Sequence, residues 1–166
     1  MGPGRGQPAA AGSEKEMALI AVVDDDDQVR RSIQRILRAA GYEVAVFAAG
    51  EDFLDSLPAA RPALVLVDLK LPGGIDGGQV LSRLAAQKDH IPAIVASGID
   101  STADRGRVAA LGAFAFFCKP FDPDSLLAAI AAALASASPE RQAESGSSGR
   151  IGPHVSEVPC PPAVAG

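Results

Sequence analysis

The fold is decided by the stretch Ala63-Leu-Val-Leu-Val-Asp68-Leu-Lys-Leu-Pro72. Its first five residues form the continuous apolar run that is typical of a strand buried on both faces of a parallel sheet. Asp68 ends that run, and a carboxylate at the end of a buried strand costs free energy unless something there uses its charge. The stretch therefore predicts a parallel strand with a functional group at its carboxyl end.

Two other apolar runs lead directly into charged residues. These residues are Asp24 and Asp25 after the run 19–23, and Lys119 after the run 114–118. In an open parallel sheet, ligands bind outside the carboxyl ends of the strands. We therefore expect the charged residues to meet Asp68 at one edge of the sheet, together with Ser97 at the end of a further run.

Short apolar runs alternate with segments of helical period along the chain. The runs lie near residues 18–23, 43–48, 63–68, 92–96 and 114–118, and the helical segments lie near 27–40, 50–57, 77–87 and 102–111. A fifth helical segment begins at Asp122-Pro123, a typical N-cap and first-turn pair. The alternation predicts an α/β fold with a five-stranded parallel sheet and five flanking helices.

The helix expected near 102–111 is the weakest of the five. Gly106 lies inside it, and only Val108 and Leu111 are large apolar residues. An interior glycine costs about 1 kcal/mol relative to alanine. The sequence leaves two interpretations open: a poorly formed helix, or an element that has to move.

Composition bounds the domain and the kind of partner. We predict one domain over 17–138, between a disordered extension over 1–16 and a disordered tail over 139–166 that is rich in Pro, Gly and Ser. The domain has eleven Lys and Arg against fifteen Asp and Glu, a net charge of -4, which argues against direct nucleic-acid binding. No signal peptide or apolar run of about 20 residues occurs, so we expect a cytoplasmic protein without membrane contact.

The cysteines and histidines give no sign of a metal site. Cys118 ends an apolar run and Cys160 lies in the tail, while His90 and His154 are isolated. This spacing matches neither a zinc site nor a disulfide framework. We interpret Cys118 as a small buried apolar residue and Cys160 as an incidental thiol of the tail.

The acidic residues at the expected sheet edge predict a divalent cation instead. Three converging carboxylates repel one another unless a cation offsets their charge. Mg²⁺ fits, because it binds through one or two carboxylates, waters and phosphoryl oxygens. Lys119 and Ser97 would then add a positive charge and a hydroxyl donor, which suits phosphoryl transfer.

The arrangement resembles the receiver domain of two-component response regulators. The matching stretches are Ala21-Val-Val-Asp-Asp25, Leu64-Val-Leu-Val-Asp68 with Leu71-Pro72, Ile94-Val-Ala-Ser97-Gly98, and Cys118-Lys-Pro-Phe121. The likeness covers residues 18–137 and implies a doubly wound, flavodoxin-like sheet of order 2-1-3-4-5. One departure is the segment Gly73-Gly-Ile-Asp76, which is one residue longer than the commonest form in the family.

The resemblance implies a role for each acidic residue. Asp68 would be the phosphoacceptor, and Asp25 would bind Mg²⁺ directly with Asp68 and the backbone carbonyl of Lys70. Asp24 would act on the ion partly through water. We interpret the two acidic residues that follow Asp25 as a solvated first turn of the first helix, where negative charge suits the helix dipole.

The resemblance also implies a switch. Ser97 would be the switch hydroxyl, and Lys119 would contact the phosphoryl group through its ammonium. Phe116 matches the aromatic switch position; the alternative is an ordinary core residue of the fifth strand. The Lys119-Pro120 peptide bond is expected to be cis, which proline permits at little cost.

The resemblance therefore implies a signalling protein and not an enzyme, although the protein would catalyse its own phosphorylation and dephosphorylation. It would receive a phosphoryl group from a sensor histidine kinase or a histidine phosphotransfer protein. No output domain follows residue 137, so we expect a stand-alone receiver that signals through an unknown downstream protein. It could pair into a homodimer through the face of the fourth helix, fifth strand and fifth helix.

Two other functions compete with this one. The first is an interaction module that keeps the fold without phosphorylation, against which Asp68, Ser97 and Lys119 speak. The second is a Mg²⁺-dependent phosphatase, which would need an aspartate where Lys70 stands.

Overall fold

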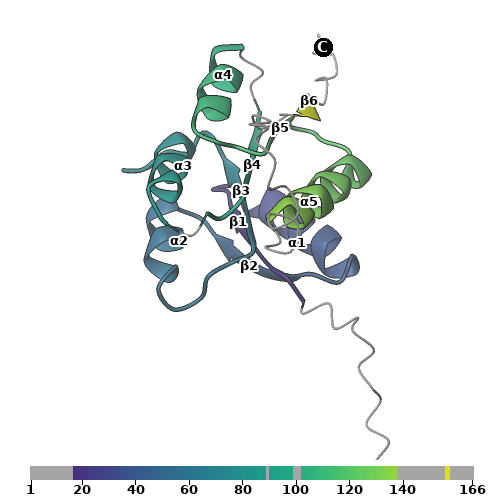
Figure 1. Ribbon diagram of the computed structural model, residues 1–166. Helices are drawn as coiled ribbons and strands as arrows, with labels where there is room; N and C mark the ends of the chain where they lie inside the picture. The colour runs from purple at the N-terminus through teal and green to yellow at the C-terminus, as the bar shows by residue number, and fades with distance from the viewer. Residues whose placement is uncertain (1–16, 89, 99–101, 138–155, 158–166) are drawn as a thin grey trace, which may run out of the picture.

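The structure, a computed structural model, describes residues 17–88, 90–98, 102–137 and 156–157. A central parallel sheet lies between two layers of helices (Figure 1). The strands are β1 (Leu19–Val23), β2 (Glu43–Phe47), β3 (Leu64–Asp68), β4 (Ala93–Ser97), β5 (Ala115–Cys118) and β6 (Ser156–Glu157). The helices are α1 (Asp27–Ala39), α2 (Gly50–Ser56), α3 (Gly77–Ala85), α4 (Thr102–Ala110) and α5 (Pro123–Ala137).

The sheet has the order β2-β1-β3-β4-β5-β6, and its strand pairs are parallel. The first five strands and the five helices confirm the predicted fold and strand order. β6 is an addition that the sequence did not predict. It comes from the segment 139–166, for which we predicted disorder; apart from Ser156 and Glu157, that segment and the extension over 1–16 lie outside the described residues.

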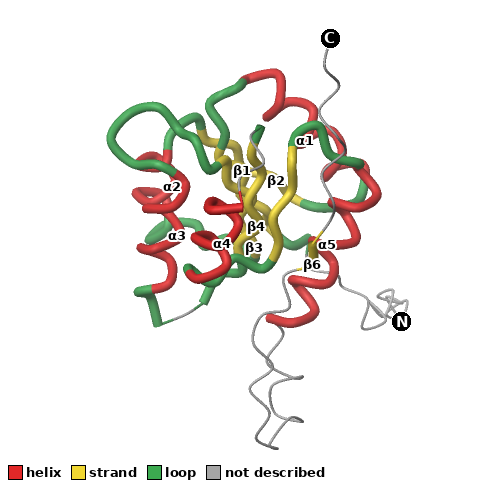
Figure 2. Tube along the Cα trace, turned by 90° about the horizontal axis from the view of Figure 1, so that it is seen from above, coloured by secondary structure: helices red, strands yellow, loops and turns green. Residues whose placement is uncertain are grey.

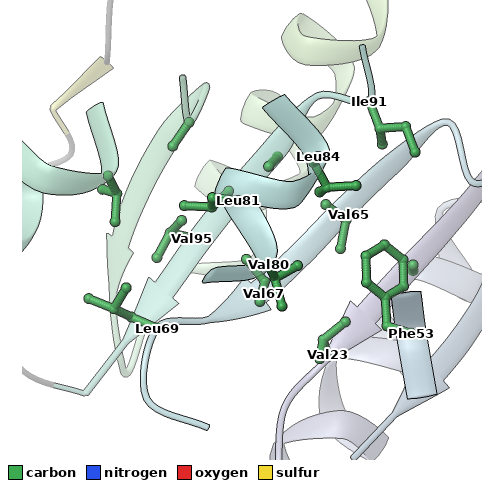
Figure 3. Close-up of a cluster of buried hydrophobic side chains, with 14 of the residues drawn as sticks. Val23, Phe53, Val65, Val67, Leu69, Val80, Leu81, Leu84, Ile91 and Val95 are labelled. Carbon is green, nitrogen blue, oxygen red and sulfur yellow. The ribbon is translucent and has the colours of Figure 1, made fainter. Parts of the chain in front are cut away.

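Along each strand, alternate residues pack into two separate hydrophobic cores, one on each face of the sheet. The odd-numbered residues of β1, β3 and β4, such as Val23, Val65 and Val95, pack under α2, α3 and α4 (Figure 3). The even-numbered residues, such as Val22 and Ile94, pack under α1 and α5. The layers are seen from above in Figure 2. Burial on both faces explains why the strands are continuously apolar.

Two residues fix where α1 begins and where it ends. The Asp26 carboxylate is the N-cap of α1 and accepts hydrogen bonds from the N–H groups of Gln28 and Val29. This agrees with a solvated start of α1, and it makes Asp26 the cap of the first turn. Gly41 has a φ of +92° after the end of α1, which glycine adopts without strain.

The prediction of a free, purely apolar Cys118 is wrong. Cys118 is 9% exposed, as a core residue should be, but it is disulfide-bonded. Sequence separation does not limit such a bond, because a disulfide depends on the distance between the two cysteines in the folded chain. Cys160 lies outside the described residues.

Candidate functional site

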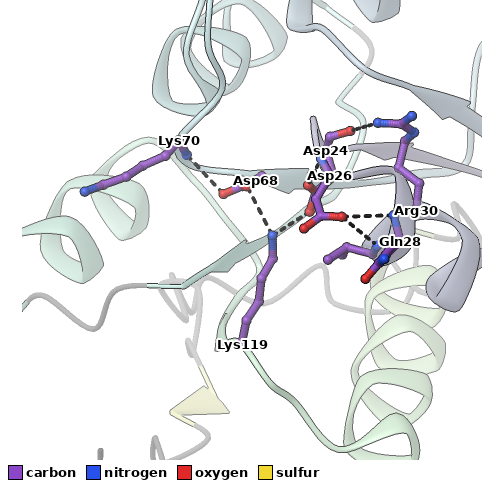
Figure 4. A network of polar contacts seen from close by, with 8 residues as sticks. Asp24, Asp26, Gln28, Arg30, Asp68, Lys70 and Lys119 are labelled. Carbon is purple, nitrogen blue, oxygen red and sulfur yellow. Dashed lines mark hydrogen bonds and ion pairs between the residues drawn. The ribbon is translucent and has the colours of Figure 1, made fainter.

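The charged residues that follow the strands meet at one edge of the sheet (Figure 4). Asp24 follows β1, Asp68 ends β3, and Lys119 follows β5. The Lys119 Nζ lies 2.5 Å from Asp24 Oδ2 and 3.1 Å from Asp68 Oδ2. Asp24 and Asp68 are only 3% and 8% exposed. One ammonium group therefore bridges two buried carboxylates, a contact between Lys119 and Asp24 that the sequence did not predict.

The second oxygen of each buried carboxylate accepts a backbone hydrogen bond. The N–H of Asp26 donates to Asp24 Oδ1 at 2.9 Å, and the N–H of Lys70 donates to Asp68 Oδ1 at 3.1 Å. In the described part of the chain, no buried side-chain nitrogen or oxygen lacks a partner. Hydrogen bonds on both oxygens fix the orientation of each carboxylate, which a reacting group requires.

Burial and neighbouring charges shift two pKa values at this edge. Burial raises the pKa of Asp68 above its ordinary value, although the Lys70 N–H and the Lys119 charge act in the opposite direction. Burial by itself would lower the pKa of Lys119. Its hydrogen bond to Asp24 and the charges of Asp68 and Asp24 outweigh burial, so the pKa of Lys119 is raised. Lys119 therefore stays charged, and a further cation would favour the ionised form of Asp68.

The donor set at this edge fits Mg²⁺. One carboxylate oxygen from each of Asp24, Asp25 and Asp68 lies within 4.8 Å of the other two. All are hard oxygen donors, which Mg²⁺ prefers. Asp25 is exposed, and among the described residues its carboxylate takes part in no hydrogen bond or ion pair. Its oxygens are thus open to an ion, while the role of the Lys70 carbonyl stays a prediction.

Ser97 lies beside this cluster at the end of β4. Ser97 is 0% exposed, and its backbone carbonyl accepts a hydrogen bond from the Lys119 N–H at 2.8 Å. Asp68 pairs in register with Ala96, and Ser97 pairs with Cys118. The structure thus places Ser97 between the ends of β3 and β5, where a switch hydroxyl is expected. The switch role itself stays a prediction.

Phe116 lies in the core beneath α4. It is 1% exposed and belongs to the same cluster as Val108 of α4. The Arg105 guanidinium carbon lies 5.1 Å from the centre of the Phe116 ring, within the range of a cation–π interaction. Phe116 is therefore a core residue in this conformation, and its switch role stays a prediction.

Two arginines near the site, Arg30 and Arg105, make contacts that the sequence did not predict. The Arg30 Nη1 donates to the Asp24 carbonyl at 2.6 Å, and its Nη2 lies 3.1 Å from Asp27 Oδ1. Arg30 lies three residues after Asp27 in α1, a spacing that places both on one helix face and could have revealed their pairing. Arg105 had no such local signal, because its partner Phe116 lies on β5.

The longer segment after Asp68 is accommodated by glycine conformation and a helix cap. Gly73 has a φ of +104°. Asp76 and Gln79 then form a capping box that begins α3 at Gly77, the predicted position. A Cβ atom on Gly77 would lie only 2.2 Å from the backbone oxygen of Asp68. The start of α3 therefore packs directly against the backbone of the candidate phosphoacceptor.

Comparison with known proteins agrees with this geometry. A family model of the response regulator receiver domain matches residues 20–131. The chain belongs to the response regulator receiver family. Transcriptional regulatory protein FixJ of Bradyrhizobium diazoefficiens is 35% identical over 125 residues, which cover 75% of this chain and 60% of FixJ. Response regulator MprA of Mycobacterium avium is 36% identical over 126 residues, or 76% of this chain and 55% of MprA.

A solved structure supports the same membership. The CheY-like receiver domain protein of Methanospirillum hungatei superposes with a TM-score of 0.70 at 28% identity, covering 76% of this chain and 98% of that chain. Against FixJ and MprA, by contrast, this receiver spans less than two thirds of the relative. In the described ranges, no helix is long and apolar enough to cross a membrane.

Proposed function

We propose that this receiver takes a phosphoryl group onto Asp68 from a phosphohistidine of a sensor histidine kinase or a histidine phosphotransfer protein. The observation that carries the proposal is the position of the Asp68 carboxylate. It ends β3 at the sheet edge, 3.1 Å from the Lys119 ammonium, and it lies among carboxylates that could share a cation. Family membership supports the same class of chemistry.

The transfer requires one bond to form and one to break. A carboxylate oxygen of Asp68 attacks the phosphorus, and the P–N bond to the imidazole breaks. The electron pair of that bond goes to the imidazole nitrogen, which leaves as a neutral ring when its other nitrogen is protonated. The Lys70 N–H holds Asp68 Oδ1 in place. Lys119, already 3.1 Å from Oδ2, can donate to the phosphoryl oxygens.

Negative charge is the main obstacle to this transfer, since Asp68 and the phosphoryl group are both anionic. Asp24, Asp25 and Asp68 would hold Mg²⁺, which when bound offsets the charge of the phosphoryl oxygens. Lys119 supplies a second, fixed positive charge on the side of Asp24 and Asp68. Preorganised charges of this kind are usually the largest contribution to catalysis.

The phosphorylated state would be read at the surface formed by α4, β5 and α5, here called the α4–β5–α5 face. Ser97 ends β4, the strand between Asp68 and this face, and Phe116 lies on β5 within the face itself. Their movement toward the phosphoryl group would change how α4 packs on β5, and a downstream protein or a second copy of the chain would bind the altered face. Such a switch biases two states that differ by a few kcal/mol. We propose that the protein works in the cytoplasm.

Labelling with a small phosphodonor tests the proposal. The chain is incubated with phosphoramidate and Mg²⁺, and its intact mass is measured. The native chain should gain one phosphoryl group that hydroxylamine removes, as it removes any acyl phosphate. Asp68→Asn should gain none, while Asp52→Asn, which changes an exposed carboxylate of α2, should label like the native chain.

Two outcomes would contradict the proposal. Equal labelling of the native chain and Asp68→Asn would remove Asp68 as the acceptor. Complete absence of labelling, with the fold intact by circular dichroism, would favour an interaction module that works without phosphorylation.

A further inference from the structure

The acidic turn between β1 and α1 is held at Asp24 by four polar contacts. The Asp24 N–H donates to the carbonyl of Phe47 in β2 at 3.0 Å. Its carboxylate oxygens accept hydrogen bonds from the Asp26 N–H and from the Lys119 ammonium. Its backbone carbonyl accepts a hydrogen bond from Arg30 Nη1 at 2.6 Å (Figure 4). Every polar group of Asp24 therefore has a partner, and Arg30 is the partner of the carbonyl.

The Asp24 carbonyl matters because it belongs to the peptide bond that joins Asp24 to Asp25. A peptide unit is planar, so a fixed carbonyl also fixes the position of the Asp25 Cα atom. Asp25 is exposed, and among the described residues its carboxylate makes no hydrogen bond or ion pair. The position of the Asp25 carboxylate near Asp68 therefore depends on the backbone that carries it.

Arg30 is itself held in place. Its Nη2 lies 3.1 Å from Asp27 Oδ1, and its side chain is 16% exposed, whereas that of the neighbouring Arg31 is 76% exposed. A guanidinium is a rigid planar group, so contacts at both of its terminal nitrogens fix its orientation. Arg30 thus presents Nη1 to the Asp24 carbonyl from a fixed position.

We propose that Arg30 is a positioning residue for the Mg²⁺ site. By fixing the peptide between Asp24 and Asp25, it keeps the Asp25 carboxylate where that group can share an ion with Asp68. The inference rests on the proposed function in one respect, namely that these carboxylates hold Mg²⁺. Groups that orient metal ligands without touching the metal typically contribute about 10–100-fold to metal affinity.

The charge of Arg30 alone would have the opposite effect. A guanidinium near the carboxylates repels a further cation and would weaken its binding. Asp27 offsets part of that charge, because its two oxygens lie 3.1 Å from Arg30 Nη2 and 3.0 Å from Arg31 Nε. Loss of Arg30 should weaken Mg²⁺ binding if Arg30 positions Asp25, and should strengthen it if only its charge counts. The sign of the change therefore separates the two explanations.

The test is a titration of the full, isotope-labelled chain with MgCl₂ at constant ionic strength, followed by the NMR shifts of backbone amides. The native chain should show saturable shifts at Asp25 and Asp68. Arg30→Gln should keep the fold by circular dichroism and raise the Kd for Mg²⁺ by about tenfold. Arg30→Lys keeps the charge but loses the planar fork, so its Kd should rise as well.

Arg31→Gln is the matched control. It removes the same charge from the next residue of α1, and among the described residues Arg31 pairs with Asp27 alone. Exposed ion pairs contribute little, so this variant should bind Mg²⁺ within about twofold of the native Kd. The Mg²⁺ concentration for half-maximal phosphoramidate labelling should rise in Arg30→Gln by the same factor as the Kd, and should stay near the native value in Arg31→Gln.

Native or tighter Mg²⁺ binding in both Arg30 variants would overturn the positioning role. An equal loss of affinity in Arg31→Gln would overturn it too, because the contact with the Asp24 carbonyl would then not be the cause. The titration needs no phosphoryl transfer, so the two proposals can fail separately. If the native chain labels at Asp68 while Arg30→Gln binds Mg²⁺ normally, the proposed function stands and the role of Arg30 falls. If Arg30→Gln weakens Mg²⁺ binding but the native chain never labels, the reverse holds.

Discussion

Helices α3 and α4 have nine residues each and pack on the same face of the sheet, yet they are held very differently. α3 begins with a capping box and buries five residues: Gly77, Gly78, Val80, Leu81 and Leu84. α4 buries only Val108 and contains Gly106. The contrast indicates that α3 anchors the loop after Asp68, the candidate phosphoacceptor, while α4 is held weakly enough to shift. Of the two explanations of the weak helix, the packing favours an element that moves.

Removing a core side chain of α3 should have the largest effect. Leu81 is 2% exposed in the core beneath α3 (Figure 3). Leu81→Ala should lower the free energy of unfolding by about 2–5 kcal/mol, because it leaves a cavity. Urea denaturation measures this, with the exposed Ser82→Ala of the same helix as control. A loss as small as that of the control would mean that α3 is no better anchored than α4.

Gly77 should be the next most sensitive position. A Cβ atom there would lie 2.2 Å from the Asp68 backbone oxygen and 2.7 Å from the Leu69 Cα. Gly77→Ala should therefore destabilise the fold by about 1–3 kcal/mol and slow labelling at Asp68, because the backbone of β3 has to move. Denaturation and phosphoramidate labelling check both effects. Normal stability and labelling would show that α3 does not constrain the acceptor.

The matched change in α4 should have the opposite sign. Gly106 is exposed, and a Cβ atom there would meet no heavy atom within 4 Å. Gly106→Ala should stabilise α4 by about 0.5–1 kcal/mol, since alanine favours the helix and restricts the unfolded chain. Amide exchange within α4 should slow by the corresponding factor. Unchanged exchange would indicate that helix propensity does not limit the stability of α4.

The smallest effect is expected where the two helices touch. Arg107 of α4 lies 3.7 Å from Asp76, the N-cap of α3, and both side chains are about half exposed. Such surface ion pairs contribute about 0–1 kcal/mol. A double-mutant cycle of Arg107→Gln and Asp76→Asn, which keeps a capping side chain, should give a coupling energy below about 1 kcal/mol. A larger coupling would mean that α4 is fixed to the anchored region.

The strands and their charged ends could be predicted because both depend on local patterns. Runs such as Leu64–Asp68 are apolar throughout because both faces are covered, so the structure places each strand within one or two residues of its prediction. Parallel pairing then brings Asp24, Asp68 and Lys119 to one edge. The helix boundaries followed from caps such as Asp122, which accepts hydrogen bonds from Ser125.

The remainder depends on contacts between distant segments that no local pattern contains. The bridge from Lys119 to Asp24, rather than to Asp68 alone, follows from the relative positions of β1 and β5 around β3. Arg105 covers Phe116 because α4 crosses β5 at that level. β6 has two residues and no apolar run that would predict it. The bonded state of Cys118 also depends on a contact between distant segments, which no local pattern predicts.

Hydrogen exchange of α3 and α4, before and after phosphorylation of Asp68, decides whether α4 is the moving element. In the unmodified chain, amides of α4 should exchange at least about tenfold faster than those of α3. Phosphoramidate and Mg²⁺ should change exchange in α4 and β5, leave α3 unaltered, and have no effect in Asp68→Asn. Equal exchange in the two helices, with no response of α4 and β5 to a phosphorylated Asp68, would contradict a switch built on this difference.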